Sequence, residues 1–249
     1  MSGLAPVSLS NRSDWGVAMD LSLLSKLNEE RVARRAAVLV TDIASGKQRL
    51  VLEADIAADP LAGVLGDALR MGKSGMVETS EGKLFLTVQA PIVRIIAIGA
   101  VHISQALVPM AQQLGFDIVI VDPRTAFASP ERFPNVELHA EWPDVALPKL
   151  GVDRYTAFVM LTHDPKIDDP ALLIALKSPS FYIGALGSRK THATRVDRLK
   201  EAGFNDEDIA RIHAPIGLNI GGISPAEVAL SILAQITAKQ RLKPDGTRA

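Results

Sequence analysis

The sequence predicts an α/β protein in which a Rossmann-like, doubly wound parallel sheet follows a small N-terminal α+β domain. Long apolar runs such as residues 92–98 lack alternation, which is typical of parallel strands buried on both faces. Each run ends at a glycine or a polar residue and precedes a helical segment, the order expected of a doubly wound sheet. This pattern begins after Ala90-Pro91, so we expect two domains, residues 1–89 and residues 90–249.

The first domain is expected to mix helices and hairpins. Residues 1–18 are interpreted as a flexible arm, and residues 21–35 carry apolar side chains at helical spacing. Asp59-Pro60 provides a cap and a first residue for a helix that ends at Gly72. Glycine-containing turns separate paired β-rich runs, which predicts two hairpins with strands at 37–41, 48–52, 76–79 and 83–88 and turns at Ser45-Gly46 and Glu81-Gly82.

In the second domain, polar or glycine-rich clusters follow the apolar runs. Parallel strands are expected at residues 92–98, 116–121, 157–161 and 181–183. One helix is expected to start at Asp169-Pro170, and another at Ser224-Pro225, where Glu227 completes a capping box. Because ligands of open α/β sheets bind outside the carboxyl ends of the strands, the clusters at these ends are the candidate site.

The first cluster is Gly99-Ala100-Val101-His102. A dinucleotide fingerprint requires glycine at its first, third and sixth positions, but only Gly99 is present, with Val101 third and Ser104 sixth. The following helix N-terminus still offers N–H groups to an anion. His102 either donates to a phosphate or is an ordinary surface histidine.

The second and third clusters contain acidic residues. Asp122 lies 23 positions after Gly99, close to the roughly 20 expected of the acid that binds ribose hydroxyls, and Arg124 is placed to bind phosphate. The alternative is that Asp122 only starts a loop. Thr162-His163-Asp164 either contacts a ligand or forms a turn in which Asp164 caps Lys166.

The fourth cluster, residues 184–191, has the composition of an anion-binding site. Glycines allow close backbone approach, hydroxyls and basic side chains bind phosphate, and a helix begins there. The candidate ligand residues are Gly184, Leu186, Gly187, Ser188, Arg189 and Thr191. The alternative is a glycine-rich turn with solvated charges. The loop 213–222 either lines the same crevice or only joins two helices.

Composition excludes several function classes. The chain has 27 basic and 28 acidic residues, which argues against a broad nucleic-acid surface. It has no cysteine, so disulfides, thiolate metal centres and thiol nucleophiles are excluded. No metal-binding motif, signal peptide or membrane-spanning apolar run is recognised, and we expect a cytoplasmic protein without a metal site.

From Val93 to Lys239 the chain resembles the xanthine dehydrogenase accessory family, of the XdhC and CoxI/CoxF type. The segments that carry this resemblance are residues 121–124, 127–134, 161–166, 182–192, 211–218 and 224–227. The resemblance implies a Rossmann-like C-terminal domain and a role in maturing a molybdenum hydroxylase, such as xanthine or carbon monoxide dehydrogenase. Family members typically bind molybdenum cofactor and deliver it after sulfuration. The implied partners are the apo-hydroxylase or its other maturation factors.

Two departures from the family pattern leave the function open. The family's Gly-Ala-Gly-His-Val-Gly is replaced by residues 99–104, and its N-terminal cysteine segment is absent, so this chain cannot relay sulfur through a thiol. The first hypothesis is a maturation factor whose crevice holds a dinucleotide (FAD or NAD(P)H) or molybdenum cofactor. The second is a flavin-dependent NAD(P)H oxidoreductase acting in metal-cluster assembly. The third is a non-catalytic chaperone of the apo-hydroxylase. No catalytic residue is assigned, and a homodimer is left open.

Overall fold

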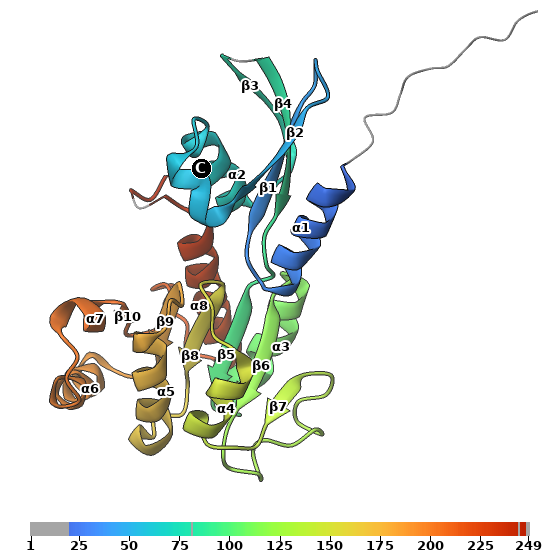
Figure 1. Ribbon diagram of the computed structural model, residues 1–249. Helices are drawn as coiled ribbons and strands as arrows, with labels where there is room; N and C mark the ends of the chain where they lie inside the picture. Colours follow the sequence, from blue (N-terminus) through green and yellow to red (C-terminus); the bar gives the residue numbers. More distant parts are fainter. Residues whose placement is uncertain (1–19, 81, 244, 248–249) are drawn as a thin grey trace, which may run out of the picture.

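The computed structural model describes residues 20–80, 82–243 and 245–247. The predicted arm, residues 1–18, and Glu81 of the second predicted turn lie outside these ranges. Figure 1 shows an antiparallel sheet above a parallel sheet, with α8 reaching from the parallel sheet towards α2. The α/β class and the Rossmann-like parallel sheet are therefore confirmed.

The N-terminal part contains a four-stranded antiparallel sheet in the order β2-β1-β4-β3. Both predicted hairpins are present, β1 with β2 and β3 with β4. Val38 and Leu86 of this sheet pack with Leu65 of α2. The elements are α1 (Leu21–Val32), β1 (Ala37–Asp42), β2 (Gln48–Leu52), the 3-10 helix η1 (Glu53–Ala58), α2 (Ala62–Met71), β3 (Gly75–Thr79) and β4 (Gly82–Gln89).

The predicted start of α2 at Asp59-Pro60 is wrong, because η1 comes first and the two residues form the turn that follows it. The Asp59 carboxylate accepts the Leu61 N–H at 2.9 Å, one residue before the helix begins. The predicted end is confirmed: Gly72 has a φ of 61°, the left-handed conformation that ends helices.

The six-stranded sheet has the order β10-β9-β8-β5-β6-β7, and every neighbouring pair is parallel. The strand order reverses between β5 and β8, which is the topological switch point of a doubly wound sheet. Its elements are β5 (Arg94–Ile98), α3 (His102–Gln113), β6 (Asp117–Val121), β7 (Glu137–His139), α4 (Pro143–Leu150), β8 (Thr156–Met160), α5 (Pro165–Lys177), β9 (Tyr182–Ala185), α6 (Arg189–Glu201), α7 (Asp206–Ala210), β10 (Ile212–His213) and α8 (Pro225–Arg241).

Helices cover both faces of this sheet. Alternate residues of β5 divide between two cores: Ile95 packs in the cluster that contains α3 and α8, and Ile96 packs in the cluster that contains α4, α5 and α6. This division explains why the strands are apolar at every position. None of the helices in the part of the chain that the structure describes is long and apolar enough to cross a bilayer.

Two predicted helix starts have different outcomes. α5 begins at Pro165, capped by Asp164, so the predicted start at Asp169-Pro170 is wrong and Pro170 lies inside the helix. The capping box of Ser224 and Glu227 at the start of α8 is confirmed. Four short elements, β7, α4, α7 and β10, had no periodicity long enough to predict them, and His213 belongs to β10 rather than to a loop.

Candidate functional site

The loops that follow β5 and β8 touch at the switch point. Gly99 has a φ of 117°, and a Cβ on this residue would lie only 2.8 Å from Cγ2 of Thr162. A glycine is therefore required here by the close approach of two loops as well as by backbone conformation. The candidate residues Gly99 and Thr162 are brought together by this contact.

Asp122, at the end of β6, is fully buried and accepts four hydrogen bonds. Its Oδ2 accepts the N–H of Ala100 at 2.8 Å and Nη2 of Arg124 at 2.7 Å. Its Oδ1 accepts the backbone N–H and Nε of Arg124, both at 2.9 Å. Burial alone would raise the pKa of Asp122, but these donors outweigh it and lower the pKa below its ordinary value. Asp122 and Arg124 thus bind each other and hold the loop after β5.

Arg132 reinforces this arrangement, and no sequence pattern points to it beyond the family segment in which it lies. Its Nη1 donates to the carbonyl of Ala100 at 2.9 Å and to that of Phe127 at 2.8 Å. The ring of Phe127 lies 4.6 Å from the guanidinium carbon of Arg124 and 5.6 Å from that of Arg132. The segment after β6 is therefore fastened over the loop after β5 by two arginines.

The start of α3 departs from a dinucleotide-binding turn. Val101 is the residue before the helix, and no side chain caps the helix there. Ser104, at the sixth fingerprint position, is buried and donates its hydroxyl to the carbonyl of Gly99. His102 is exposed on the first turn. The serine therefore stabilises the turn from within, at a position where a dinucleotide fold requires a glycine.

The loop after β8 is held by a residue that sequence reasoning missed, Asp168 of α5. Its carboxylate accepts the hydroxyl of Thr162 at 2.7 Å and the N–H of His163 at 3.2 Å. His163 has a φ of 62°, which a side chain of this size rarely adopts without such support. Asp164 caps the N–H of Lys166 at 3.0 Å. Burial raises the pKa of the Asp168 carboxyl.

The segment 184–191 combines packing positions with a helix cap. A Cβ on Gly184 would lie 2.5 Å from Cδ1 of Ile216, so this glycine is needed for packing. Gly187 has a φ of 131°. The Ser188 hydroxyl accepts the N–H of Thr191 at 3.1 Å and lies 2.9 Å from the Thr191 hydroxyl. The two hydroxyls therefore bond to each other at the start of α6.

Behind this segment lies a buried arginine that the sequence analysis also missed. Arg195 is only 2% exposed; its Nη2 donates to the carbonyl of Leu186 at 2.9 Å, while its Nε and Nη1 have no partner among the described residues. Burial lowers the pKa of Arg195. Asp168 attracts it electrostatically, but no ion pair within 4.0 Å joins the two in the ranges described. Two buried, opposite charges without direct contact are costly unless a further group joins them.

Arg195 and Asp168 both line a cavity of about 320 Å³ between the N-terminal parts of α5 and α6. Other lining side chains come from the predicted clusters: His163 from the third, and Lys190 and Thr191 from the fourth. Buried titratable groups with shifted pKa values beside a cavity are typical of functional sites. Among the described residues, no group of three or more His, Asp or Glu side chains is arranged to hold a metal ion.

The structure thus gathers the predicted residues into two groups. The first contains Gly99, Ala100, Asp122 and Arg124, where Asp122 accepts hydrogen bonds from Ala100 and Arg124. The second joins the loop after β8 to the segment 184–191 around the cavity. Leu186 contributes through its carbonyl to Arg195, and Arg189 is exposed at the first position of α6 without a hydrogen bond to a described residue.

Comparison with curated proteins finds relatives of similar sequence. The chain is 36% identical over 165 residues to the uncharacterized protein YqeB of Escherichia coli (strain K12), covering 66% of this chain and 30% of YqeB. It is 31% identical over 148 residues to the molybdenum cofactor insertion chaperone PaoD of the same organism, covering 59% of this chain and 40% of PaoD. It is 29% identical over 154 residues to a probable xanthine dehydrogenase subunit of Bacillus subtilis (strain 168), covering 61% of this chain and 44% of that protein.

A solved structure has a similar fold. The crystal structure of a xanthine dehydrogenase from Bacillus halodurans superimposes with a TM-score of 0.63 at 22% identity, covering 90% of this chain and 65% of that one. The chain spans less than half the length of the curated relatives it matches. Residues 95–236, more than half of the chain, match the family described as the XdhC Rossmann domain. The resemblance seen in the sequence is therefore confirmed, and the chain belongs to the XdhC family.

Proposed function

We propose that this protein acts in the maturation of a molybdenum hydroxylase of the xanthine or carbon monoxide dehydrogenase type, with an anionic guest held at the carboxyl edge of its parallel sheet. Membership of the XdhC family supports the role, as does the name of the relative PaoD, a molybdenum cofactor insertion chaperone. The partner in this proposal is the apo-hydroxylase or another of its maturation factors.

The observation that carries the ligand proposal is the unsatisfied guanidinium of Arg195 beside the cavity between α5 and α6. Leaving a buried donor without a partner costs about 1–3 kcal/mol, and an anion that reaches the guanidinium from this cavity would relieve that cost. Lys190 and Thr191 also line the cavity, and the positive end of the α6 dipole adds attraction for an anion. In the described lining, three cationic side chains (Lys190, Arg195 and Arg198) outnumber two carboxylates (Asp168 and Asp169), and this excess of positive charge suits a phosphate group.

The other group of residues fits a conventionally bound dinucleotide poorly. Val101 carries a branched side chain where a pyrophosphate requires glycine. Both carboxylate oxygens of Asp122 are already bonded to Arg124, so a ribose diol would have to displace the guanidinium. We therefore assign the guest's phosphate to α6 and give Asp122 a structural role. The guest is the molybdenum cofactor, FAD or NAD(P)H, all of which carry phosphate.

The test combines a gene deletion with complementation. Deleting the gene should leave the hydroxylase synthesised but inactive, and the wild-type chain should restore its activity. Arg195→Met should fail to restore it, whereas Lys200→Met should succeed, because Lys200 lies on the same helix and, among the residues that the structure describes, pairs with Asp206 alone, at the surface. A fully active hydroxylase in the deletion strain would refute the maturation role.

The guest is identified on the purified chain by its absorption spectrum and by mass spectrometry of what denaturation releases. A flavin spectrum that NAD(P)H bleaches would favour the second hypothesis, the flavin-dependent oxidoreductase. Released pterin would favour cofactor delivery. The chain could instead co-purify with the apo-hydroxylase and release no small molecule, while Arg195→Met restores full activity. Those two results together would refute the ligand proposal and favour a chaperone that binds only the protein.

A further inference from the structure

A second cavity, larger than the one between α5 and α6, lies at the other ends of the parallel strands. Its volume is about 630 Å³, within the roughly 300–1,000 Å³ usual for small-molecule sites. Val93, Phe116, Tyr155 and Phe181 line it, and each immediately precedes a parallel strand, so the cavity lies at the amino ends of β5, β6, β8 and β9. The opposite wall comes from η1 and α2 of the N-terminal part.

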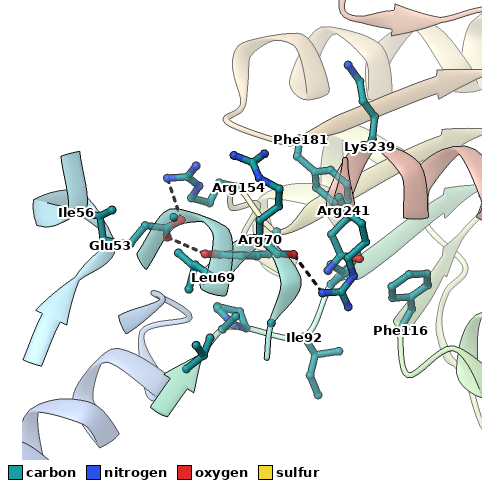
Figure 2. A pocket seen from close by; sticks show the side chains of 18 of the residues that line it. Glu53, Ile56, Leu69, Arg70, Ile92, Phe116, Arg154, Phe181, Lys239 and Arg241 are labelled. Carbon is teal, nitrogen blue, oxygen red and sulfur yellow. Dashed lines mark hydrogen bonds and ion pairs between the residues drawn. The ribbon is translucent and has the colours of Figure 1, made fainter. Parts of the chain in front are cut away.

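Hydrogen bonds hold the two walls in place. The hydroxyl of Tyr155 donates to the Glu53 carboxylate at 2.7 Å, and Arg154 forms an ion pair with the same carboxylate at 3.2 Å. On the other side Nη1 of Arg241 donates to the carbonyl of Arg70 at 3.1 Å, at the end of α2. Figure 2 shows Glu53 on one side of the pocket and Phe116 and Arg241 on the other.

The pocket carries an excess of positive charge. Of the described residues that line it, four are cationic (Arg70, Arg154, Lys239 and Arg241) and one, Glu53, has a carboxylate, so positive charges exceed negative ones by three. Glu53 is already bonded to Arg154 and Tyr155. Nε of Arg70 is buried and has no hydrogen-bond partner among the described residues. Such a site attracts an anion and rejects a cation.

The uncharged part of the lining is aromatic and aliphatic. Phe116, Phe181 and Tyr155 provide ring surfaces, with Ile92 and Leu69 beside them. Rings of this kind pack against flat aromatic molecules, and an arginine stacks on the same molecules. A ligand that satisfies both parts of the lining must therefore be flat at one end and anionic at the other.

We propose that this pocket between the two sheets is a second ligand site, which binds a phosphate ester of an aromatic heterocycle of about mononucleotide size. The heterocycle packs on the phenylalanine rings, and the phosphate is bound by Arg70 and Lys239. This site is independent of the cavity at α6, because the two cavities share no lining residue and lie at opposite edges of the sheet.

The test is a set of binding titrations on the full chain with riboflavin 5′-phosphate, riboflavin, GMP and inorganic phosphate. We expect riboflavin 5′-phosphate or GMP to bind. Riboflavin alone and inorganic phosphate alone should each bind at least tenfold more weakly than riboflavin 5′-phosphate. Arg70→Met should weaken that binding at least tenfold. Lys239→Ala should weaken it about threefold; Lys239 is exposed and donates to no described residue, so this variant tests the site even if Arg70→Met fails to fold.

The matched control is Lys149→Ala, which removes a lysine whose one ion pair within the described part of the chain is with Glu141 at the surface. Arg195→Met, at the other cavity, shows whether the probe binds there instead. Lys149→Ala should not change the affinity for the probe that binds most tightly. No binding by any probe, or equal affinity in Arg70→Met, Lys239→Ala and wild type, would overturn the proposal. A loss of binding in Arg195→Met alone would also overturn it, by assigning the probe to α6. None of these results affects the complementation test of the maturation role.

Discussion

The buried carboxylate of Asp122 offers the sharpest test of how the loop after β5 is held. Asp122→Ala removes all four hydrogen bonds at once. The N–H of Ala100, itself fully buried, then has no acceptor. Arg124 is affected less, because its side chain is 35% exposed and regains water. The main loss should therefore come from the orphaned backbone donor.

The size of the effect follows from these two contributions. An orphaned buried donor costs about 1–3 kcal/mol. The partly exposed ion pair with Arg124 adds about 1 kcal/mol. The free energy of unfolding should therefore fall by about 2–4 kcal/mol, which for a chain of this size lowers Tm by roughly 4–16 °C.

Urea unfolding of Asp122→Ala, beside the matched control Asp117→Ala, measures this loss. Asp117 lies on the same strand and pairs with Arg94 at 3.1 Å, but its side chain is 43% exposed, so the control should lose only about 0–1 kcal/mol. Equal losses in the two variants would refute the reasoning.

The pH dependence gives a second check on Asp122. Its pKa in the folded state lies below the ordinary value of 3.8, so its stabilisation is fully present above that value and is lost as the pH falls through the folded pKa. The stability difference between wild type and Asp122→Ala should therefore narrow below about pH 4. A difference that stays constant down to pH 2 would contradict a lowered pKa.

Two further substitutions test local packing and capping. Gly184→Ala would place a Cβ 2.5 Å from Ile216 and 2.6 Å from the Tyr182 hydroxyl, so urea unfolding should show a loss of about 1–3 kcal/mol. Its control, Gly63→Ala in α2, meets nothing within 4 Å and should gain about 0.5–1 kcal/mol; a similar loss in both variants would disprove the packing argument. Ser224→Ala removes the acceptor of the Glu227 N–H and should cost about 0.5–2 kcal/mol, and an unchanged Tm would show that α8 does not depend on this cap.

Four strands of the parallel sheet, β5, β6, β8 and β9, were predictable because each lies in an apolar run that ends at a polar or glycine-rich cluster, whereas β7 and β10 are too short to show such a run. The same reasoning located the switch-point residues Gly99 and Thr162 at neighbouring strand ends, since parallel strands share one carboxyl edge. This reasoning was wrong at Pro170, which was predicted to start a helix. The helix starts five residues earlier, at Pro165, where Asp164 is the N-cap. Capping and proline signals compete, and the local sequence does not decide between them.

The candidate site was predictable only in part. The spacing from Gly99 predicted that Asp122 is a ribose-binding acid. Only the tertiary structure shows that the Arg124 guanidinium donates to both oxygens of the Asp122 carboxylate. Asp168 and Arg195 have no distinguishing pattern, since charged residues within helices are usually solvated. Their burial depends on how α5 and α6 pack beside β8 and β9.

The amino-acid order alone determined the fold class, the family and the positions of the loops that carry polar residues, because periodicity, turn residues and caps act between near neighbours in the chain. Only the tertiary structure decided which charges are buried without partners and which surfaces enclose a cavity. Burial and electrostatic shifts depend on distances between segments far apart in sequence, such as α2 and α8 around the pocket between the sheets. Those distances are set by packing of the whole domain rather than by any local motif.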